Sequence, residues 1–180
     1  MIDSVKGKGA GETAIMSRGN RKEPAVPRIQ GLYETHLTVS TLERSVPFYR
    51  DVVGLELATV FADRVAFFWV GGRETAMLGL WQSGGAPIGL RLHFAFKVSL
   101  EDVLAAAARL KSHGVQPLGF HNEPLDQPVV IGWMPAASQY FCDPDGHSLE
   151  FIHMLDEEGD PAFGVQPYAR WLARGRGATA

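Results

Sequence analysis

The sequence has little cysteine and no large excess of charge of either sign. Cys142 is the only cysteine in 180 residues, so no disulfide can form within the chain and nothing requires an oxidising compartment. The 17 basic and 20 acidic residues give a net charge of −3, which does not provide the broad positive surface that nucleic-acid binding needs. We therefore expect a cytoplasmic protein with no nucleic-acid partner.

Long apolar runs are also missing. Runs such as residues 103–108 are far shorter than the ~20 residues that a membrane-spanning helix requires, and the first residues lack the apolar region of a secretory signal. We expect no membrane partner. What is present, 46% hydrophobic and 21% charged residues, is typical of a folded protein with one domain or two small subdomains.

The two ends of the chain differ from its middle. Residues 1–29 are rich in Gly, Lys, Arg and Glu without apolar periodicity, which predicts a flexible N-terminal extension. Residues 156–180 alternate Gly, Pro and charge around a few large apolar residues, which predicts a C-terminal extension with a short packed segment and a frayed tip. Residues 30–155 remain as the folded domain.

The middle of the chain repeats one pattern twice, in modules at about 31–84 and 90–155. Each begins with an alternating segment typical of a strand, at 32–40 and 90–98, followed by a capping-box pattern and a helical spacing that stops at glycine. The capping boxes are Ser40-x-x-Glu43 and Ser99-x-x-Asp102. Three short strand candidates follow in each module, at 55–61, 65–70, 75–81 and at 115–120, 138–141, 148–154.

This order predicts an α+β fold: two βαβββ modules that form a cupped mixed β-sheet, with the helices packed outside. Within it the two histidines of the first strands are equivalent. His93 follows His36 by 57 positions, and Glu150, in the last strand, follows His93 by another 57. Because side chains alternate along a strand, both histidines are predicted to point away from the helix layer, and a curved sheet can bring them together with Glu150.

Two imidazoles and one carboxylate form the facial set that holds a divalent metal and leaves coordination positions open. We therefore predict His36, His93 and Glu150 as metal ligands, for iron, manganese, zinc or nickel. The other histidines have simpler explanations. His147 is expected to belong to a tight turn, His153 to face the helix side, and His113 to sit favourably at a helix C-terminus.

Three segments resemble the vicinal oxygen chelate superfamily. They are residues 34–39, residues 45–55 and the signature Asp143-Pro-Asp-Gly-His-Ser-Leu-Glu150 within 140–151. The superfamily includes glyoxalase I, extradiol dioxygenases, fosfomycin resistance transferases and metal-free bleomycin resistance proteins. The resemblance covers about residues 31–155, implies paired βαβββ modules around a metal, and places His36, His93 and Glu150 on ligand positions.

The resemblance also implies roles for further residues. Tyr140 matches the tyrosine found near the metal in extradiol dioxygenases, and His121 is the candidate for their acid/base histidine. Thr38, Ser138 and Tyr140 fall on cavity positions of fosfomycin transferases. However, residues 122–137 contain no Lys or Arg to bind a phosphonate, and residues 75–82 lack the carboxylate that glyoxalase I takes from its first module.

Two more residues are candidates for substrate binding. Lys97 shares a predicted strand face with His93, although a solvated lysine is the simpler explanation. Trp133 lies in the segment 121–137, whose length favours a functional lid, with a dimer contact as the alternative.

These observations predict a metal-dependent enzyme that chelates vicinal oxygens of a small substrate. Dioxygenase chemistry is weakly favoured. Glyoxalase-like lyase or isomerase chemistry and thiol transfer remain open, as does a metal-free binding protein of the resistance type. The resemblance further implies a homodimer, in which His36 of one chain can serve a different site from His93 and Glu150.

Overall fold

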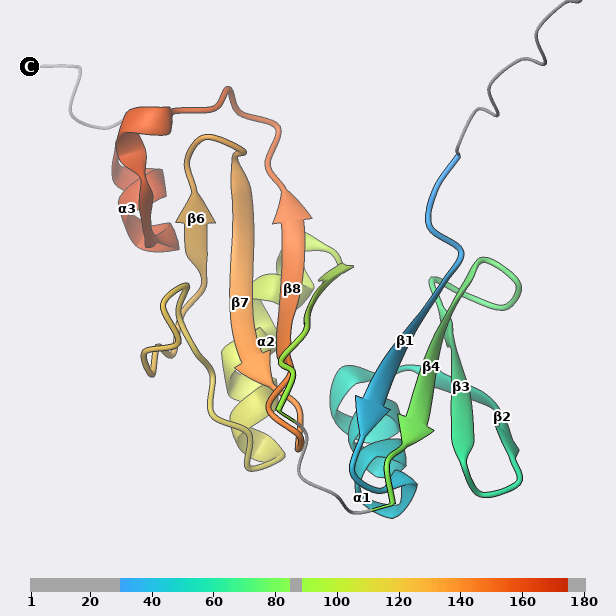
Figure 1. Ribbon diagram of the computed structural model, residues 1–180. Coiled ribbons are helices and arrows are strands. Elements are labelled where there is room, and N and C mark those ends of the chain that lie inside the picture. Colours follow the sequence, from blue (N-terminus) through green and yellow to red (C-terminus); the bar gives the residue numbers. More distant parts are fainter. Residues whose placement is uncertain (1–29, 85–88, 175–180) are drawn as a thin grey trace, which may run out of the picture. The chain divides into compact units, whose positions relative to one another are not determined.

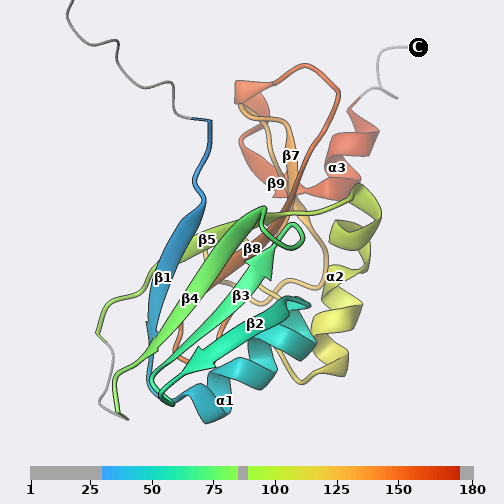
Figure 2. The ribbon, with the colours of Figure 1, turned by 90° about the vertical axis from the view of Figure 1, so that its right-hand side faces the viewer.

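The computed structural model describes residues 30–84 and 89–174 (Figure 1). The first module forms a four-stranded sheet in the order β1-β4-β3-β2, with β1 parallel to β4 and the other neighbours antiparallel. Figure 2 shows these strands side by side. Their bounds are β1 Glu34–Val39, β2 Glu56–Phe61, β3 Val65–Val70 and β4 Ala76–Gln82.

The second module repeats this order in a five-stranded sheet, β5-β8-β7-β6-β9. Here β5 is parallel to β8, and the remaining pairs are antiparallel. The bounds are β5 His93–Lys97, β6 Val129–Ile131, β7 Ala136–Cys142, β8 Ser148–Met154 and β9 Val165–Pro167. The α+β class and the internal repeat are thus confirmed.

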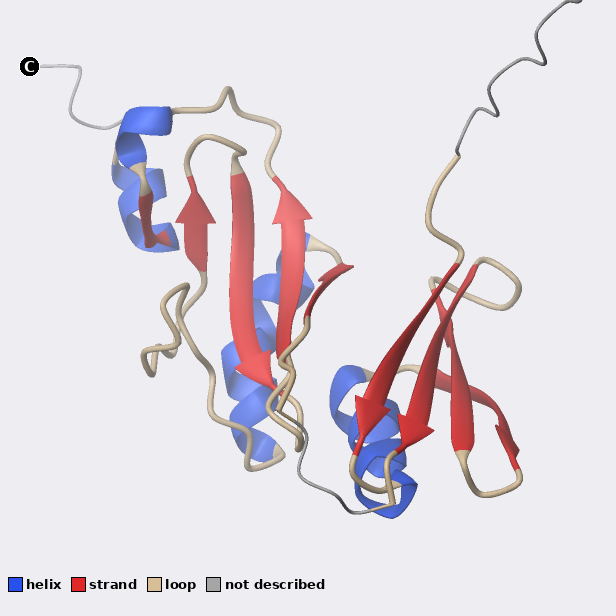
Figure 3. Cartoon of the chain, in the orientation of Figure 1, coloured by secondary structure: helices blue, strands red, loops and turns tan. Residues whose placement is uncertain are grey.

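Each first strand leads into a helix (Figure 3). In the second module α2 (Leu100–Ser112) begins as predicted, because the Ser99 hydroxyl accepts a hydrogen bond from the Asp102 N–H at 3.1 Å. In the first module the predicted capping box is wrong. Thr41 is the N-cap of α1 (Leu42–Pro47) without a side-chain cap, and the Ser40 hydroxyl instead accepts from the Arg44 guanidinium.

Pro47 ends α1 and is followed by a π-helical segment, η1 (Phe48–Val53). Proline has no N–H to continue an α-helical hydrogen-bond pattern, which accounts for a change of helix type at this point. Gly54 then ends the segment with φ +89°, a conformation that favours glycine.

One hydrophobic core joins the helix-facing sides of both modules. It includes Leu37 and Tyr49 of the first module and Leu110, Phe141 and Leu149 of the second. The rings of Phe48 and Phe141 lie 6.5 Å apart, so η1 packs against the second sheet as well as its own. The opposite faces of the two first strands, which carry the histidines, are left exposed.

The turn that carries the signature motif also connects the modules. The Tyr49 hydroxyl donates to Asp143 at 2.9 Å, and Arg44 forms an ion pair with Asp145. Buried His147 accepts from the Leu92 N–H at 3.1 Å through Nδ1 and contacts the Thr38 carbonyl at 2.8 Å through Nε2. Since Nδ1 accepts, Nε2 carries the hydrogen and donates. The structural role predicted for His147 agrees with these contacts.

The segment between α2 and β7 differs from the prediction. Residues 115–120 form only isolated bridges through Leu118, and the strand of this region is β6, which pairs with β7 and with β9. The three residues of β6 are buried, so the apolar core of the predicted lid is part of the sheet. The prediction of a strand at 115–120 is wrong, and within the segment 121–137, which was predicted to form a lid, residues 129–131 form a strand of the sheet instead.

The predicted N-terminal extension, 1–29, lies outside the described residues. In the C-terminal segment, β9 joins the second sheet and is followed by α3 (Tyr168–Ala173). Trp171 of α3 is buried, which supplies the packed segment expected there. Among the helices that the structure describes, none combines the length and apolar character needed to cross a membrane.

Candidate functional site

His93 and Glu150 meet on the outer face of the second sheet. The strands β5 and β8 run parallel with His93 opposite Ser148 and Ala95 opposite Glu150, so both side chains project from the same face. The distance from His93 Nε2 to Glu150 Oε2 is 3.2 Å. This part of the predicted ligand set comes together within one module.

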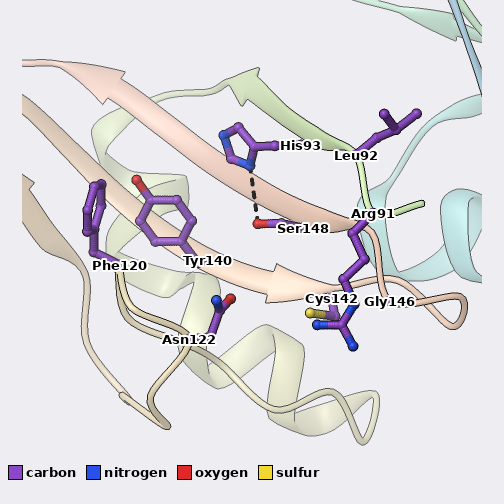
Figure 4. Close-up of a pocket in the computed structure, with 9 residues that line it drawn as sticks. All are labelled: Arg91, Leu92, His93, Phe120, Asn122, Tyr140, Cys142, Gly146 and Ser148. Carbon is purple, nitrogen blue, oxygen red and sulfur yellow. Dashed lines mark hydrogen bonds between the residues drawn. The ribbon is translucent and has the colours of Figure 1, made fainter. Parts of the chain in front are cut away.

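Ser148 holds the other side of the imidazole, with its Oγ 3.1 Å from His93 Nδ1 (Figure 4). A hydroxyl can donate or accept, so it accommodates either tautomer of His93. When it accepts from Nδ1–H, the Nε2 lone pair is free for a metal, which is the usual arrangement of a metal-bound histidine and its hydrogen-bond partner.

Two buried oxygens on this face, Glu150 Oε1 and Ser138 Oγ, make no hydrogen bond of ordinary geometry, although Tyr140 lies close enough to both residues for them to affect its pKa. Glu150 is 4% exposed, and a buried acceptor left unpaired costs about 1–3 kcal/mol. Such groups in a folded protein call for a ligand, an ion or a water molecule. The chemistry of the donor set, one imidazole and one carboxylate with an unused oxygen, fits a divalent metal.

Tyr140 lies beside this pair, since β7 places it opposite Glu150. Its ring is 6.1 Å from that of His93 and meets Phe120 edge to face at 5.9 Å. Burial, and secondarily the negative charge of Glu150, raise the pKa of the Tyr140 phenol above its usual value. The hydroxyl therefore stays protonated at neutral pH and can donate a hydrogen bond.

A pocket of about 360 Å³ opens beside His93 (Figure 4). Its walls combine aromatic rings with a few polar side chains, as small-molecule sites usually do. Burial raises the pKa of the Cys142 thiol in this wall, while nearby Arg91 acts in the opposite direction. The lining residues are Arg91, Leu92, His93, Phe120, Asn122, Tyr140, Cys142, Gly146 and Ser148.

Sequence reasoning missed Arg91 and Asn122. Asn122 lies in a loop, where the alternation of side chains along a strand gives no information. For Arg91 a signal was present, because it stands two positions before His93 and alternation places both on one face.

His36 occupies the equivalent place in the first sheet but has different neighbours. The Trp81 indole N–H donates to His36 Nδ1 at 2.6 Å, and Glu34 Oε1 lies 2.6 Å from Nε2. Gly79 lies opposite His36, where a Cβ would come within 2.3 Å of Nδ1. Glycine thus leaves the space that the imidazole occupies.

The register explains the carboxylate missing from the first module. In β1 and β4, His36 is opposite Gly79 and Thr38 is opposite Trp81, just as His93 is opposite Ser148 and Ala95 is opposite Glu150. Trp81 therefore stands where the second module has Glu150. The indole can donate to a histidine but cannot ligate a metal.

The structure does not bring His36 to the other two predicted ligands. Within residues 30–84 and 89–174, no group of three His, Cys, Asp or Glu side chains is placed to hold a metal ion. His93 and Glu150 lie together and His36 does not join them, and the metal-ligand role of all three stays a prediction.

The remaining predicted site residues are spread over the surface and core. Ser138 is buried on the same face as Tyr140, whereas Thr38 and Lys97 are exposed on their strands. Trp133 is 67% exposed in the turn between β6 and β7. The His121 ring packs against Phe120 at 5.1 Å. Of these five, none is among the residues that line the pocket, and their roles stay predictions.

Paired βαβββ modules with a histidine and glutamate on one face define a protein of the vicinal oxygen chelate class. The profile of the Glyoxalase/Bleomycin resistance protein/Dioxygenase superfamily matches residues 31–151, and the chain belongs to this superfamily. This confirms the resemblance drawn from the sequence motifs.

Solved structures agree with this assignment. The integron cassette protein HFX_CASS4, from the mobile metagenome of the Halifax Harbour sewage outfall, is 34% identical, with a TM-score of 0.57 over 70% of this chain and 100% of that chain. Lactoylglutathione lyase from Agrobacterium tumefaciens is 23% identical, with a TM-score of 0.54 over 70% and 95%. Oxidase ChaP-H2 is 23% identical, with a TM-score of 0.57 over 72% and 98%. The last two likenesses concern the fold alone.

Proposed function

We propose that the protein is a metal-dependent enzyme that binds vicinal oxygens of a small substrate. The observation that carries this proposal is the buried Glu150 carboxylate, whose Oε1 has no hydrogen-bond partner and whose Oε2 lies 3.2 Å from His93 Nε2. A divalent cation would compensate the buried charge and use both groups as ligands.

His36 from a second copy of the chain is the third ligand in this proposal. Both histidine faces are exposed in a single chain, and the His36 side chain is 38% exposed. The same face of the first sheet carries Trp81, and Phe61 lies at its edge, 46% and 58% exposed. Exposed large aromatic side chains on one face favour a protein contact, and a homodimer would bring the first sheet of one copy over the second sheet of another.

The bound metal would supply Lewis-acid chemistry to the chelated oxygens. The residues of the chain then have distinct tasks. Tyr140, kept protonated, donates a hydrogen bond to a substrate oxygen, while Ser148 orients the His93 ring. Phe120 and Tyr140 provide aromatic walls for a planar substrate, and Ser138 offers a further buried hydroxyl.

Among reactions of the superfamily, we favour oxygen-dependent conversion of an aromatic ortho-diol. The pocket has aromatic walls, and one carboxylate with two histidines leaves coordination positions open. Trp81 in place of a second carboxylate argues against a site with two glutamates. Lyase or isomerase chemistry on a hemithioacetal, and thiol transfer, are the alternatives that a substrate test must separate.

The test is metal analysis of protein reconstituted with Fe²⁺, Mn²⁺, Zn²⁺ or Ni²⁺ and then freed of excess metal. We expect close to one equivalent per chain for at least one metal, and binding weaker by at least about 100-fold in His93→Ala, because a lost ligand costs more than the 10–100-fold of a lost ligand partner. The matched control is His113→Ala, which removes an exposed histidine of the second module.

Metal below about a tenth of an equivalent in every case, or unchanged by His93→Ala, would favour a metal-free binding protein instead. With metal bound, oxygen consumption with catechol is the expected activity. Turnover of a hemithioacetal without oxygen uptake would assign the lyase or isomerase reaction.

A further inference from the structure

Arg91 is a cation without an ion-pair partner at the pocket wall. It lines the pocket together with His93 and Asn122, and in the part of the chain that the structure describes no carboxylate lies within ion-pair distance of its guanidinium. A free guanidinium at a pocket is suited to an anionic ligand group.

The acidic residues of the neighbouring turn are already engaged. Asp143 accepts hydrogen bonds from the Tyr49 hydroxyl and from the N–H groups of Asp145 and His147. Asp145 is bound by Arg44 and Ser45. Both carboxylates thus have other partners, and neither forms an ion pair with Arg91, so its charge remains available to a ligand.

The backbone around Arg91 is fixed. The neighbouring Leu92 N–H donates to His147 Nδ1 at 3.1 Å, and its carbonyl accepts from the Ser148 N–H at 2.9 Å. Gly146, with φ +86°, lies under the guanidinium, where a Cβ would be 3.5 Å from Arg91 Nε. The side chain therefore extends over a glycine turn from a strand whose position is set by hydrogen bonds.

Arg91 and His93 lie on one face, two positions apart. Two residues of extended chain separate the Cα atoms by about 6.5 Å, and both side chains line the same pocket, so one substituted benzene ring is of a size to contact both. A ring whose oxygens reach His93, beside which Glu150 lies at 3.2 Å, can thus place a para substituent toward Arg91 in the same pocket, which the Asn122 amide also lines.

We propose that Arg91 is a specificity residue that binds a carboxylate of an aromatic substrate. This inference rests on the proposed function for the other end of the substrate. A singly charged carboxylate is the group of choice, because Arg91 is the one cationic residue among the pocket-lining residues and a phosphonate or phosphate dianion needs more than one cationic partner.

The experiment compares benzoate with benzamide on metal-free protein by NMR titration of ¹⁵N-labelled chain. The two probes differ in charge and share shape, so their affinity ratio isolates the anion contact. We expect benzoate to bind roughly three- to tenfold more tightly, as an exposed charge pair contributes modestly. The ratio should fall to about one in Arg91→Gln and be partly kept in Arg91→Lys. Arg170→Gln, the same charge change on exposed α3, should leave it unchanged.

A ratio near one for the natural sequence, a ratio retained in Arg91→Gln, or no binding of either probe at millimolar concentration would overturn the inference. The proposed function is read separately, from the gain in affinity of 3,4-dihydroxybenzoate over benzoate when metal is added. A charge preference without that gain leaves Arg91 as an anion site and removes the metal chemistry. A gain in affinity on adding metal, without a charge preference, would support the metal chemistry and rule out Arg91 as the anion site.

Discussion

The two modules share a backbone plan and one histidine, but they differ in the residues around that histidine. The register pairs His36, Gly79 and Trp81 of the first sheet with His93, Ser148 and Glu150 of the second. On the next strands, Val65 and Phe67 correspond to Tyr140 and Cys142. Polar groups around the second histidine are thus replaced by glycine, an indole or apolar side chains around the first.

This difference suits the two modules to different tasks, one with polar groups beside a pocket and the other with an aromatic surface. The second module has an unpaired buried carboxylate oxygen and a pocket beside it. The first module satisfies its histidine with Glu34 and Trp81 and surrounds it with aromatic rings. We infer that the second sheet supplies most of the chemistry, and that the first contributes one imidazole and an apolar wall.

The largest effect, on metal binding, is expected when either histidine is removed. His36→Ala and His93→Ala should each weaken metal binding by at least about 100-fold, because each removes a proposed ligand. Mixing and re-equilibrating the two variants should restore metal at about a quarter of the sites, since half of the random pairs are mixed and each mixed pair has one intact site. Metal content per chain is the measurement.

If His36→Ala binds metal normally, the site belongs to the second module alone. If each variant is defective and mixing restores nothing, the three ligands come from a single chain. Either result would contradict the exchange between copies.

A smaller effect is expected from giving the first module the carboxylate that it lacks. Trp81→Glu places an oxygen ligand beside His36, and a fourth protein ligand should tighten zinc binding by about tenfold. Competition with a chelator measures the change. Trp81→Phe is the matched control, because it removes the indole N–H without adding a ligand. Equal affinities of the two variants would show that position 81 does not face the metal.

The smallest effect is expected from Tyr140, whose counterpart Val65 cannot titrate. Burial raises the pKa of Tyr140 in the folded chain, so above about pH 10 the folded state keeps a proton that the unfolded state has lost. The free energy of unfolding must then fall as pH rises, by at most about 1.4 kcal/mol per pH unit for this one group. Tyr140→Phe should reduce that fall in urea unfolding between pH 10 and 11. Identical slopes for both proteins would contradict the prediction.

Much of the fold could be predicted because its signals are local. Alternation predicted which way His93 points from its own strand, and the predicted strands at 65–70 and 148–154 match β3 and β8. The cap at Ser99 was also found, since its hydrogen bond spans three residues. Each of these features is determined by neighbours in the sequence.

The features that were missed depend on distant partners. Residues 129–131, within the predicted lid at 121–137, form a strand that pairs with β9 more than thirty positions away, and no local pattern reveals such a pairing. The location of His36 depends on which faces of the two sheets share a core, and alternation alone does not specify that choice. The correspondence between Trp81 and Glu150 becomes visible only in the register of the two sheets.

The imidazole of His147 forms hydrogen bonds to both repeats at once. Its ring contacts the carbonyl of Thr38, two residues after His36, and the N–H of Leu92, one residue before His93. The motif that identifies the superfamily therefore also connects the two halves of the duplicated fold, through hydrogen bonds to the main chain of each. A single copy of the motif is enough for this purpose, since one bridge serves both repeats.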